Sequence, residues 1–284
     1  CIGKINNSYI ISSESCAIDS IGGKFIRDVN PGEMVVIDED GFHSYYCENK
    51  KTTSLCLFEY IYVARPDSVI DGVNVNLARR KAGEILFKEN PVEADIVCGV
   101  PDSGLDAALG YSRHSGIPYG IGLIKNKYIG RTFISPGQTA RVEGVRIKLS
   151  AISSAVKDKR IVLVDDSIVR GNTMGRVVNI LREAGAKEVH VRISSPPFIH
   201  PCYYGTDIDS EENLIACRHT VHEISGIIGA DSLGYFPPER LYELAGGCGF
   251  CSACFGGGYP TPVPEDTRKD RYELKLSERT KQCI

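Results

Sequence analysis

Hydrophobic and polar positions along residues 55–200 follow two alternating patterns, one typical of buried strands and one typical of amphipathic helices. Short runs of consecutive apolar residues predict strands at 95–100, 118–124, 160–164 and 188–194. Apolar residues at helical spacing predict helices over 75–88, 103–115 and 173–184. Strands that alternate with helices favour an α/β fold, in which a parallel sheet has helices on both faces.

Residues 1–50 have a different pattern. Short β-type runs at 8–11 and 34–37 are separated by turn signals such as Asn30-Pro31-Gly32. We therefore expect a β-rich unit over 1–50, an α/β domain over 51–245, and a cysteine-bearing loop with a tail over 246–284. The polar stretch 125–150 has no period, which predicts a long loop followed by a short helix.

Composition excludes several classes of protein. The 284 residues are 42% hydrophobic and 24% charged, and the net charge of −3 argues against a nucleic-acid-binding protein. The N-terminal residues do not resemble a secretion signal, and no apolar run predicts a membrane-spanning helix. We therefore expect a cytoplasmic protein. In that compartment the eleven cysteines are expected to be metal ligands or core residues, and not disulfides.

The clearest candidate chemistry follows the third predicted strand. Its apolar run ends in Asp165 and Asp166, and the chain then turns through Gly171 into a helix. Ligands bind at the carboxyl ends of strands in open parallel sheets. Backbone N–H groups over 169–173 and the Thr173 hydroxyl suit a phosphate monoester, and the two acids suit ribose hydroxyls or a metal ion. By itself an acidic strand-to-helix turn is more often only a helix cap.

Two more segments suit a phosphorylated ligand. Asp102-Ser103-Gly104 follows another predicted strand and can face a pyrophosphate or its Mg²⁺. The segment 125–133 carries Lys125, Lys127 and Arg131, as expected for a lid that closes on a polyphosphate. Alone, the first segment would be a capped helix start and the second a solvated basic loop.

The run from Ile161 to Thr173 resembles the 5-phosphoribosyl 1-pyrophosphate (PRPP) signature of type I phosphoribosyltransferases. The spacings of dinucleotide-binding and Walker motifs are absent. Together with 59–68, 125–133 and 146–150, the run resembles the glutamine PRPP amidotransferase family. The resemblance implies that ammonia, obtained from glutamine, displaces pyrophosphate from PRPP in the first committed step of purine synthesis. It also implies a homotetramer that purine nucleotides inhibit.

On this basis we assign roles to the candidate residues. PRPP is expected to contact Asp102, Ser103, Gly104, Asp165, Asp166, Val169, Arg170, Gly171, Asn172 and Thr173. Mg²⁺ is expected on Ser103, Asp165 and Asp166, and Lys125 and Arg131 are expected to act in catalysis with the two acids. One alternative is a non-catalytic module that senses PRPP or purine nucleotides, and another is a salvage phosphoribosyltransferase that uses a free base. The cationic segment 125–131 favours an enzyme.

The cysteines suggest a metal centre. Cys251 and Cys254 form a C-x₂-C pair, a spacing that can place two thiolates on one centre. In the iron–sulfur branch of the family, cysteines in matching contexts bind a [4Fe–4S] cluster, and the resemblance extends this role to Cys56, Cys202, Cys251 and Cys254. Cys248 could replace one ligand, and zinc would also accept four thiolates.

Two other cysteine features are weaker. Cys217 with His219 and His222 could form a His/Cys cluster, but such residues more often have no metal. Cys1 occupies the position of the family's glutaminase nucleophile, yet the residues after it do not resemble that domain's opening. Residues 12–19 and 25–37 resemble its closing strands instead. We therefore interpret the chain as lacking most of the glutaminase domain and expect Cys1 to be non-catalytic.

Overall fold

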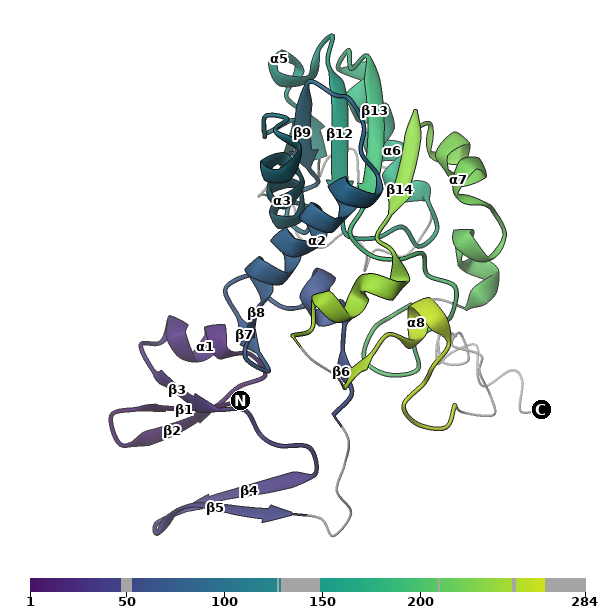
Figure 1. The fold of residues 1–284 in the computed structure, drawn as a ribbon. Coiled ribbons are helices and arrows are strands. Elements are labelled where there is room, and N and C mark those ends of the chain that lie inside the picture. The colour runs from purple at the N-terminus through teal and green to yellow at the C-terminus, as the bar shows by residue number, and fades with distance from the viewer. Residues whose placement is uncertain (47–52, 127, 129–148, 209, 247–248, 264–284) are drawn as a thin grey trace, which may run out of the picture.

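The computed structural model describes residues 1–46, 53–126, 128, 149–208, 210–246 and 249–263. A parallel four-stranded sheet lies at its centre, with the strand order β14–β13–β12–β9 (Figure 1). The strands are β9 (Ile96–Gly99), β12 (Arg160–Asp165), β13 (Glu188–Ile193) and β14 (Ser232–Tyr235). In the register of the sheet, Ile161 of β12 lies between Ile96 and Val189. The predicted parallel α/β sheet is confirmed.

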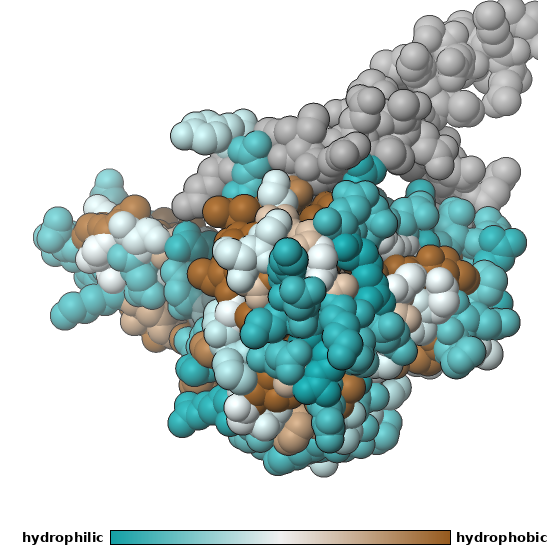
Figure 2. All heavy atoms as spheres, turned by 90° about the horizontal axis from the view of Figure 1, so that it is seen from above, coloured by the Kyte–Doolittle hydropathy of each residue, from teal (hydrophilic) through white to brown (hydrophobic). Residues whose placement is uncertain are grey.

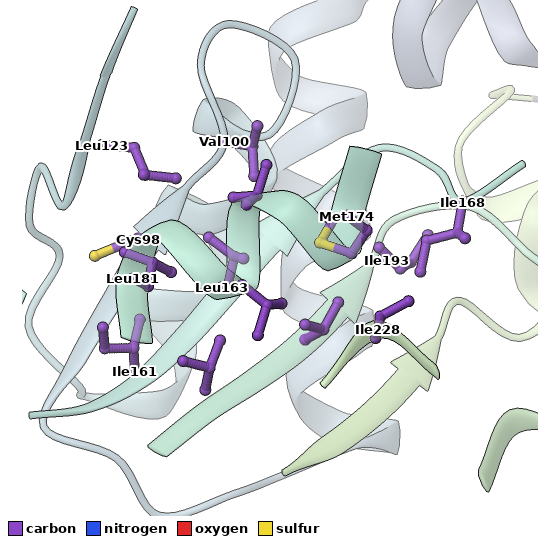
Figure 3. Packing of buried hydrophobic residues seen from close by; sticks show 14 of the residues in the cluster. Cys98, Val100, Leu123, Ile161, Leu163, Ile168, Met174, Leu181, Ile193 and Ile228 are labelled. Atoms are coloured by element: carbon purple, nitrogen blue, oxygen red, sulfur yellow. The ribbon is translucent and has the colours of Figure 1, made fainter. Parts of the chain in front are cut away.

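Helices cover both faces of this sheet. The helices are α2 (Val75–Glu89) and α3 (Leu105–Ser115) on one face, and α6 (Asn172–Glu183) and α7 (Val221–Ile228) on the other. Alternate residues of β12 divide between the two cores: Ile161 and Leu163 pack with α6, and Val162 and Val164 pack with α2 and α3. Figure 3 shows Leu181 and Met174 of α6 over Leu163 in the first of these cores.

The close crossing of α2 and α3 depends on two glycines. A Cβ atom on Gly83 would lie 1.9 Å from the Ala107 carbonyl oxygen, and one on Gly110 would lie 2.0 Å from the Arg80 carbonyl oxygen. Backbone therefore packs on backbone, and no larger side chain fits without moving a helix. This contact fixes α3, and with it the loop that joins β9 to α3.

The strand predicted at 118–124 forms only in part. Tyr119 pairs with Val97 of β9 as an isolated parallel bridge, and the Val97 N–H donates to the Pro118 carbonyl at 2.9 Å. The end of the segment forms β10 (Leu123–Lys125), which pairs antiparallel with β11 (Leu149–Ala151) outside the central sheet. Gly120 and Gly122 interrupt the segment and Ile121 is exposed, whereas Leu123 is buried in the core that contains α6. A short helix, α5 (Ser153–Val156), then precedes β12.

The N-terminal residues form a small antiparallel sheet and a separate hairpin (Figure 1). The elements are β1 (Ile2–Ile5), β2 (Ser8–Ile11), α1 (Ser15–Ser20), β3 (Lys24–Arg27), β4 (Glu33–Asp38) and β5 (Gly41–Tyr46). The strands predicted at 8–11 and 34–37 are present, but α1 is a helix where only β-type runs were expected. Burial of Cys16 and Ile18 explains the helix, because these residues anchor it on the sheet.

The remaining elements are short. They are β6 (Leu55–Cys56), the π-helix η1 (Glu59–Val63), β7 (Val69–Ile70), β8 (Val73–Asn74), η3 (Glu211–Asn213), η4 (Ile215–Cys217), η5 (Pro238–Glu243), β15 (Phe250–Cys251) and α8 (Ala253–Gly256). Phe198 packs against Phe58 and Phe255, with ring centroids 5.3 and 4.9 Å apart. This aromatic cluster and the β6–β15 pair hold the C-terminal segment on the domain.

The surface has mixed character. Seen from above, hydrophilic residues form a band across the face and hydrophobic residues lie in several separate places (Figure 2). Within the described ranges, no helix has the length and apolar character needed to cross a membrane.

Candidate substrate site and cysteine pocket

The acidic pair lies at the carboxyl end of β12, in the middle of the sheet. Asp165 is the last residue of the strand, and both it and Asp166 are more than 90% buried. The Asp165 Oδ1 atom accepts a hydrogen bond from the Asp166 backbone N–H at 2.9 Å, and a longer one from the Ser103 hydroxyl at 3.4 Å. The Ser167 hydroxyl donates to the Asp166 carboxylate. The structure thus brings Ser103 to the acids with which it was predicted to act.

Burial raises the pKa of Asp165 well above its usual range, and the adjacent negative charge of Asp166 raises it further. Two carboxylates held side by side in a buried position repel each other when both are ionised. A divalent cation or the hydroxyls of a ligand would stabilise the ionised pair, because both interact favourably with carboxylate oxygens. These donors therefore fit the predicted Mg²⁺.

The segment 169–173, which we call the phosphate loop, leads from the acids into α6. Gly171 has φ of +84° and is the N-cap residue, and α6 begins at Asn172. The first N–H groups of a helix have no acceptor within the helix, so those of the first turn can meet a phosphate. A hydrogen bond from the Ile215 N–H to the Val169 carbonyl, at 2.9 Å, fixes the start of the loop. Arg170, Asn172 and Thr173 are exposed.

The segment 102–104, which we call the pyrophosphate loop, packs on the same strand end. A Cβ atom on Gly104 would lie 2.2 Å from the Val164 carbonyl oxygen, so only glycine allows the loop this close to β12. The Val100 N–H also donates to the Val164 carbonyl, at 2.9 Å. Because β9 and β12 are neighbours, their two loops lie side by side at one edge of the sheet.

The structure pairs Lys125 with the pyrophosphate loop. The Lys125 ammonium makes an ion pair with the Asp102 carboxylate, whose side chain is 70% exposed. The sequence carries no signal for this contact, because it joins two segments that are not consecutive in the fold. Lys127 and Arg131 lie outside the described residues, so Lys125 is the described member of the predicted lid cations.

The four predicted cluster cysteines line one cavity of about 440 Å³. Pairing of β6 with β15 sets Cys56 opposite Cys251. The Cys254 carbonyl accepts hydrogen bonds from the N–H groups of Ile199 and His200 at 3.1 and 3.2 Å, which brings the segment before Cys202 to α8. Other lining residues are Glu59, Tyr62, Tyr204, Thr206 and Tyr259.

The thiols of this pocket influence one another. Burial raises the pKa of Cys56 and of Cys254, and the three other thiols raise the pKa of Cys254 further. Within the described ranges, no group of three or more His, Cys, Asp or Glu side chains converges as a site for a single ion. Zinc would draw four sulfurs to about 2.3 Å from one centre, whereas cysteines around a cluster bind different irons. Four thiols that line one cavity supply the ligand type that both a cluster and zinc accept.

The other cysteines lie elsewhere. Cys217 is exposed and its thiol donates to the Ile199 carbonyl, while Cys16 and Cys98 are buried. The N-terminal amine of Cys1 donates to the Ser12 carbonyl at 2.7 Å. Cys47, Cys248 and Cys283 lie outside the described residues. One pocket contact had no sequence signal: the Tyr204 N–H donates to the Cys202 sulfur at 3.4 Å.

Comparison with known proteins first defines the class. Residues 74–194 match the family model for the phosphoribosyl transferase domain. This range contains β9, β12 and β13 with both candidate loops, so the site described above lies inside a phosphoribosyltransferase domain.

The similarity extends well beyond that domain. The chain is 52% identical to amidophosphoribosyltransferase of Bacillus subtilis, over 94% of this chain and 57% of the relative. It is 53% identical to the Archaeoglobus fulgidus amidophosphoribosyltransferase, over 93% of this chain and 59% of the relative. The chain is thus homologous to amidophosphoribosyltransferases over nearly its whole length, and it spans less than two thirds of theirs.

A solved structure agrees. The glutamine phosphoribosylpyrophosphate (PRPP) amidotransferase from B. subtilis, complexed with ADP and GMP, superposes with a TM-score of 0.86 at 52% sequence identity. The superposition covers 93% of this chain and 60% of the other.

Proposed function

We propose that this chain carries the transferase site of an amidophosphoribosyltransferase, which converts PRPP and ammonia to 5-phosphoribosylamine and pyrophosphate. One observation carries the proposal: the phosphate loop, the pyrophosphate loop and the Asp165–Asp166 pair lie together at one edge of the sheet. A ligand with a phosphate at one end and a pyrophosphate at the other suits that spacing of anion-binding loops around a sugar-binding pair of acids.

Each part of the site has its role in this proposal. The first N–H groups of α6 and the Thr173 hydroxyl bind the 5′-phosphate, and Ser103 and Gly104 face the pyrophosphate. Asp165 and Asp166 bind the ribose hydroxyls or their cation. Mg²⁺, held through Ser103, Asp165 and Asp166, would supply positive charge to the departing pyrophosphate.

The reaction needs no protein nucleophile. A bond forms from the ammonia nitrogen to ribose C1, the bond from C1 to the pyrophosphate oxygen breaks, and the nitrogen then loses a proton to solvent. Positive charge grows on the ring and negative charge on the pyrophosphate, so catalysis depends on position and electrostatics. Lys125, released from Asp102, and Arg131 would neutralise the leaving group and help to exclude water.

For the cysteine pocket we propose a [4Fe–4S] cluster on Cys56, Cys202, Cys251 and Cys254. Its contribution would be structural, because the transfer moves no electrons between donor and acceptor. The four thiols come from β6, the segment after β13, β15 and α8, so one group bound to all of them would tie these elements together.

Regulation and assembly are part of the same proposal. The B. subtilis relative was solved with ADP and GMP, which supports purine nucleotides as ligands of this chain too. We expect a homotetramer in the cytoplasm, without nucleic-acid or membrane partners.

The test is pyrophosphate release from PRPP and Mg²⁺ by the anaerobically purified protein, with ammonia and with glutamine in parallel. We expect release with ammonia. PRPP binding without pyrophosphate release under either condition would contradict the proposed transferase activity and favour a non-catalytic sensor. Absence of PRPP binding would overturn both.

A further inference from the structure

A carboxylate of the N-terminal unit holds a loop of the α/β domain. The Glu14 Oε2 atom accepts hydrogen bonds from the Arg65 backbone N–H at 2.8 Å and from the Ser68 hydroxyl at 2.7 Å. Next to it, the Ser15 hydroxyl accepts a hydrogen bond from the Val69 N–H at 2.8 Å. Ser68 is fully buried. These contacts, between residues more than fifty positions apart, join α1 to the chain just before α2, where Figure 1 shows α1 beside β7 and β8.

The loop held by Glu14 in turn supports the start of α2. The Val75 N–H donates to the Ser68 carbonyl, and the Asn76 N–H donates to the Pro66 carbonyl, both at 3.0 Å. N–H groups in the first turn of a helix need acceptors from outside the helix, and this loop supplies two of them. The position of the loop therefore sets the position of the first turn of α2.

That first turn contacts the first turn of α3, which directly follows the pyrophosphate loop. The Asn76 side-chain amide donates to the Asp106 carboxylate at 2.7 Å. Asp106 lies in the first turn of α3, two residues after Gly104. Further along the two helices, the glycine contacts place the backbone of α2 directly against that of α3. A shift of α2 therefore also moves α3.

Arg79 adds a second connection at the same turn of α2. Its guanidinium is 5% exposed and donates to the carbonyls of Tyr60 at 2.9 Å and Ala64 at 2.7 Å, which binds η1 to the helix. Burial lowers the pKa of Arg79, and the negative charges of Asp106, Asp166 and Glu14 oppose that shift. One buried cation thus interacts electrostatically with the substrate site and with the N-terminal unit.

We infer that Glu14 is a positioning residue for the pyrophosphate loop: by clamping residues 65–68 it fixes α2, and through Asn76 and Asp106 it fixes the start of α3. What the loop binds rests on the proposed function, but the positioning does not. Removing the carboxylate frees the Ser68 hydroxyl and the Arg65 N–H, and the first turn of α2 and the pyrophosphate loop become looser together.

Hydrogen exchange tests this inference on the intact protein. The variants are Glu14→Ala, the milder Glu14→Gln, and the control Glu33→Ala. Among the described residues, the Glu33 carboxylate bonds to Arg27, Asn30 and Ser44, which all belong to the N-terminal unit. We expect Glu14→Ala to accelerate exchange about tenfold at 65–69, since a hydrogen bond to a charged group is lost, and about threefold at 102–106. Glu14→Gln should give smaller changes at the same places.

Three results would overturn the inference. These are faster exchange at 65–69 without any change at 102–106, an equal change at 102–106 in Glu33→Ala, or no change in Glu14→Ala at either place. If the wild type releases pyrophosphate, Glu14→Ala should also raise KM for PRPP about threefold with kcat nearly unchanged, while Glu33→Ala leaves both alone. A wild type without PRPP turnover would contradict the proposed function, and the exchange data would still decide the role of Glu14.

Discussion

We call the site formed by Asp165, Asp166, the phosphate loop and the pyrophosphate loop the strand-end site. It differs from the cysteine pocket in how far apart along the chain its residues lie. The acids and the phosphate loop fall within nine consecutive residues, 165–173, of one strand–helix unit, and a neighbouring strand adds the pyrophosphate loop. The pocket takes its cysteines from positions between 56 and 254, joined by two-residue strands and an aromatic cluster. The buried sheet thus holds the first site, and the second depends on long-range pairing.

This comparison implies that a mutation in one site leaves the other site intact. A change at the strand ends should remove activity and leave the fold intact, because the sheet is held by two cores of buried hydrophobic residues. A change in the pocket should loosen the C-terminal segment first.

The largest effect is expected from the acidic pair. Replacing Asp165 and Asp166 together by asparagine removes the charges that bind ribose or its cation, and should lower ammonia-dependent pyrophosphate release by about 1,000-fold or more. The control is Asp158→Asn, at the opposite end of β12, where Asn tolerates the positive φ of 59°. Full activity of the double variant would show that the strand-end site is not the site of pyrophosphate release.

Gly104→Ala should lower kcat/KM for PRPP by about 100-fold, because the new Cβ atom meets the Val164 carbonyl and displaces the pyrophosphate loop by a fraction of an ångström or more. Steady-state kinetics with ammonia measures this. The matched control is Gly226→Ala in α7, where a Cβ atom meets nothing within 4 Å. Equal losses in the two variants would mean that the close approach of the loop to β12 is unimportant.

Cys254→Ser tests the other region. We expect anaerobically purified protein to lose its bound iron and sulfide and the visible absorption of the cluster, while ammonia-dependent release falls by no more than about tenfold. Cys217→Ser, outside the pocket, should change neither. Loss of the sheet's circular dichroism in Cys254→Ser would show that the two regions are not independent.

How much the sequence could predict follows the same division. The strands at 160–164 and 188–194, the helix at 173–184 and the placing of Asp165 at the end of a strand come from local patterns, and the structure has them all. The grouping of Cys56 with Cys251 rested on a family resemblance, because no local pattern specifies pairing across almost 200 residues. The sequence analysis missed α1, the Lys125–Asp102 ion pair and the hydrogen bonds of Glu14 to residues 65–68. All three depend on tertiary contacts, which no local pattern specifies.

A smaller effect concerns pH and stability without Mg²⁺. Burial raises the pKa of Asp165 above its value in the unfolded chain, so this group's stabilisation is fully present below about pH 4 and is lost as pH rises through the raised pKa. Asp165→Asn has no such ionisation. Its Tm relative to wild type should therefore be higher at pH 8 than at pH 5, by a few degrees.

Thermal denaturation in a chelating buffer measures this difference, and added Mg²⁺ should shrink it by stabilising the ionised wild type. A relative Tm that does not change with pH would show that Asp165 titrates as an exposed carboxyl does.

The central claim is that one PRPP molecule spans the phosphate and pyrophosphate loops across the Asp165–Asp166 pair. The most direct measurement is a crystal structure of this protein with Mg²⁺ and PRPP. We expect the 5′-phosphate on the N–H groups of 171–173, the pyrophosphate at Ser103 and Gly104, and the ribose beside the two acids. A PRPP molecule bound anywhere else, or bound without contact to these acids, would contradict it.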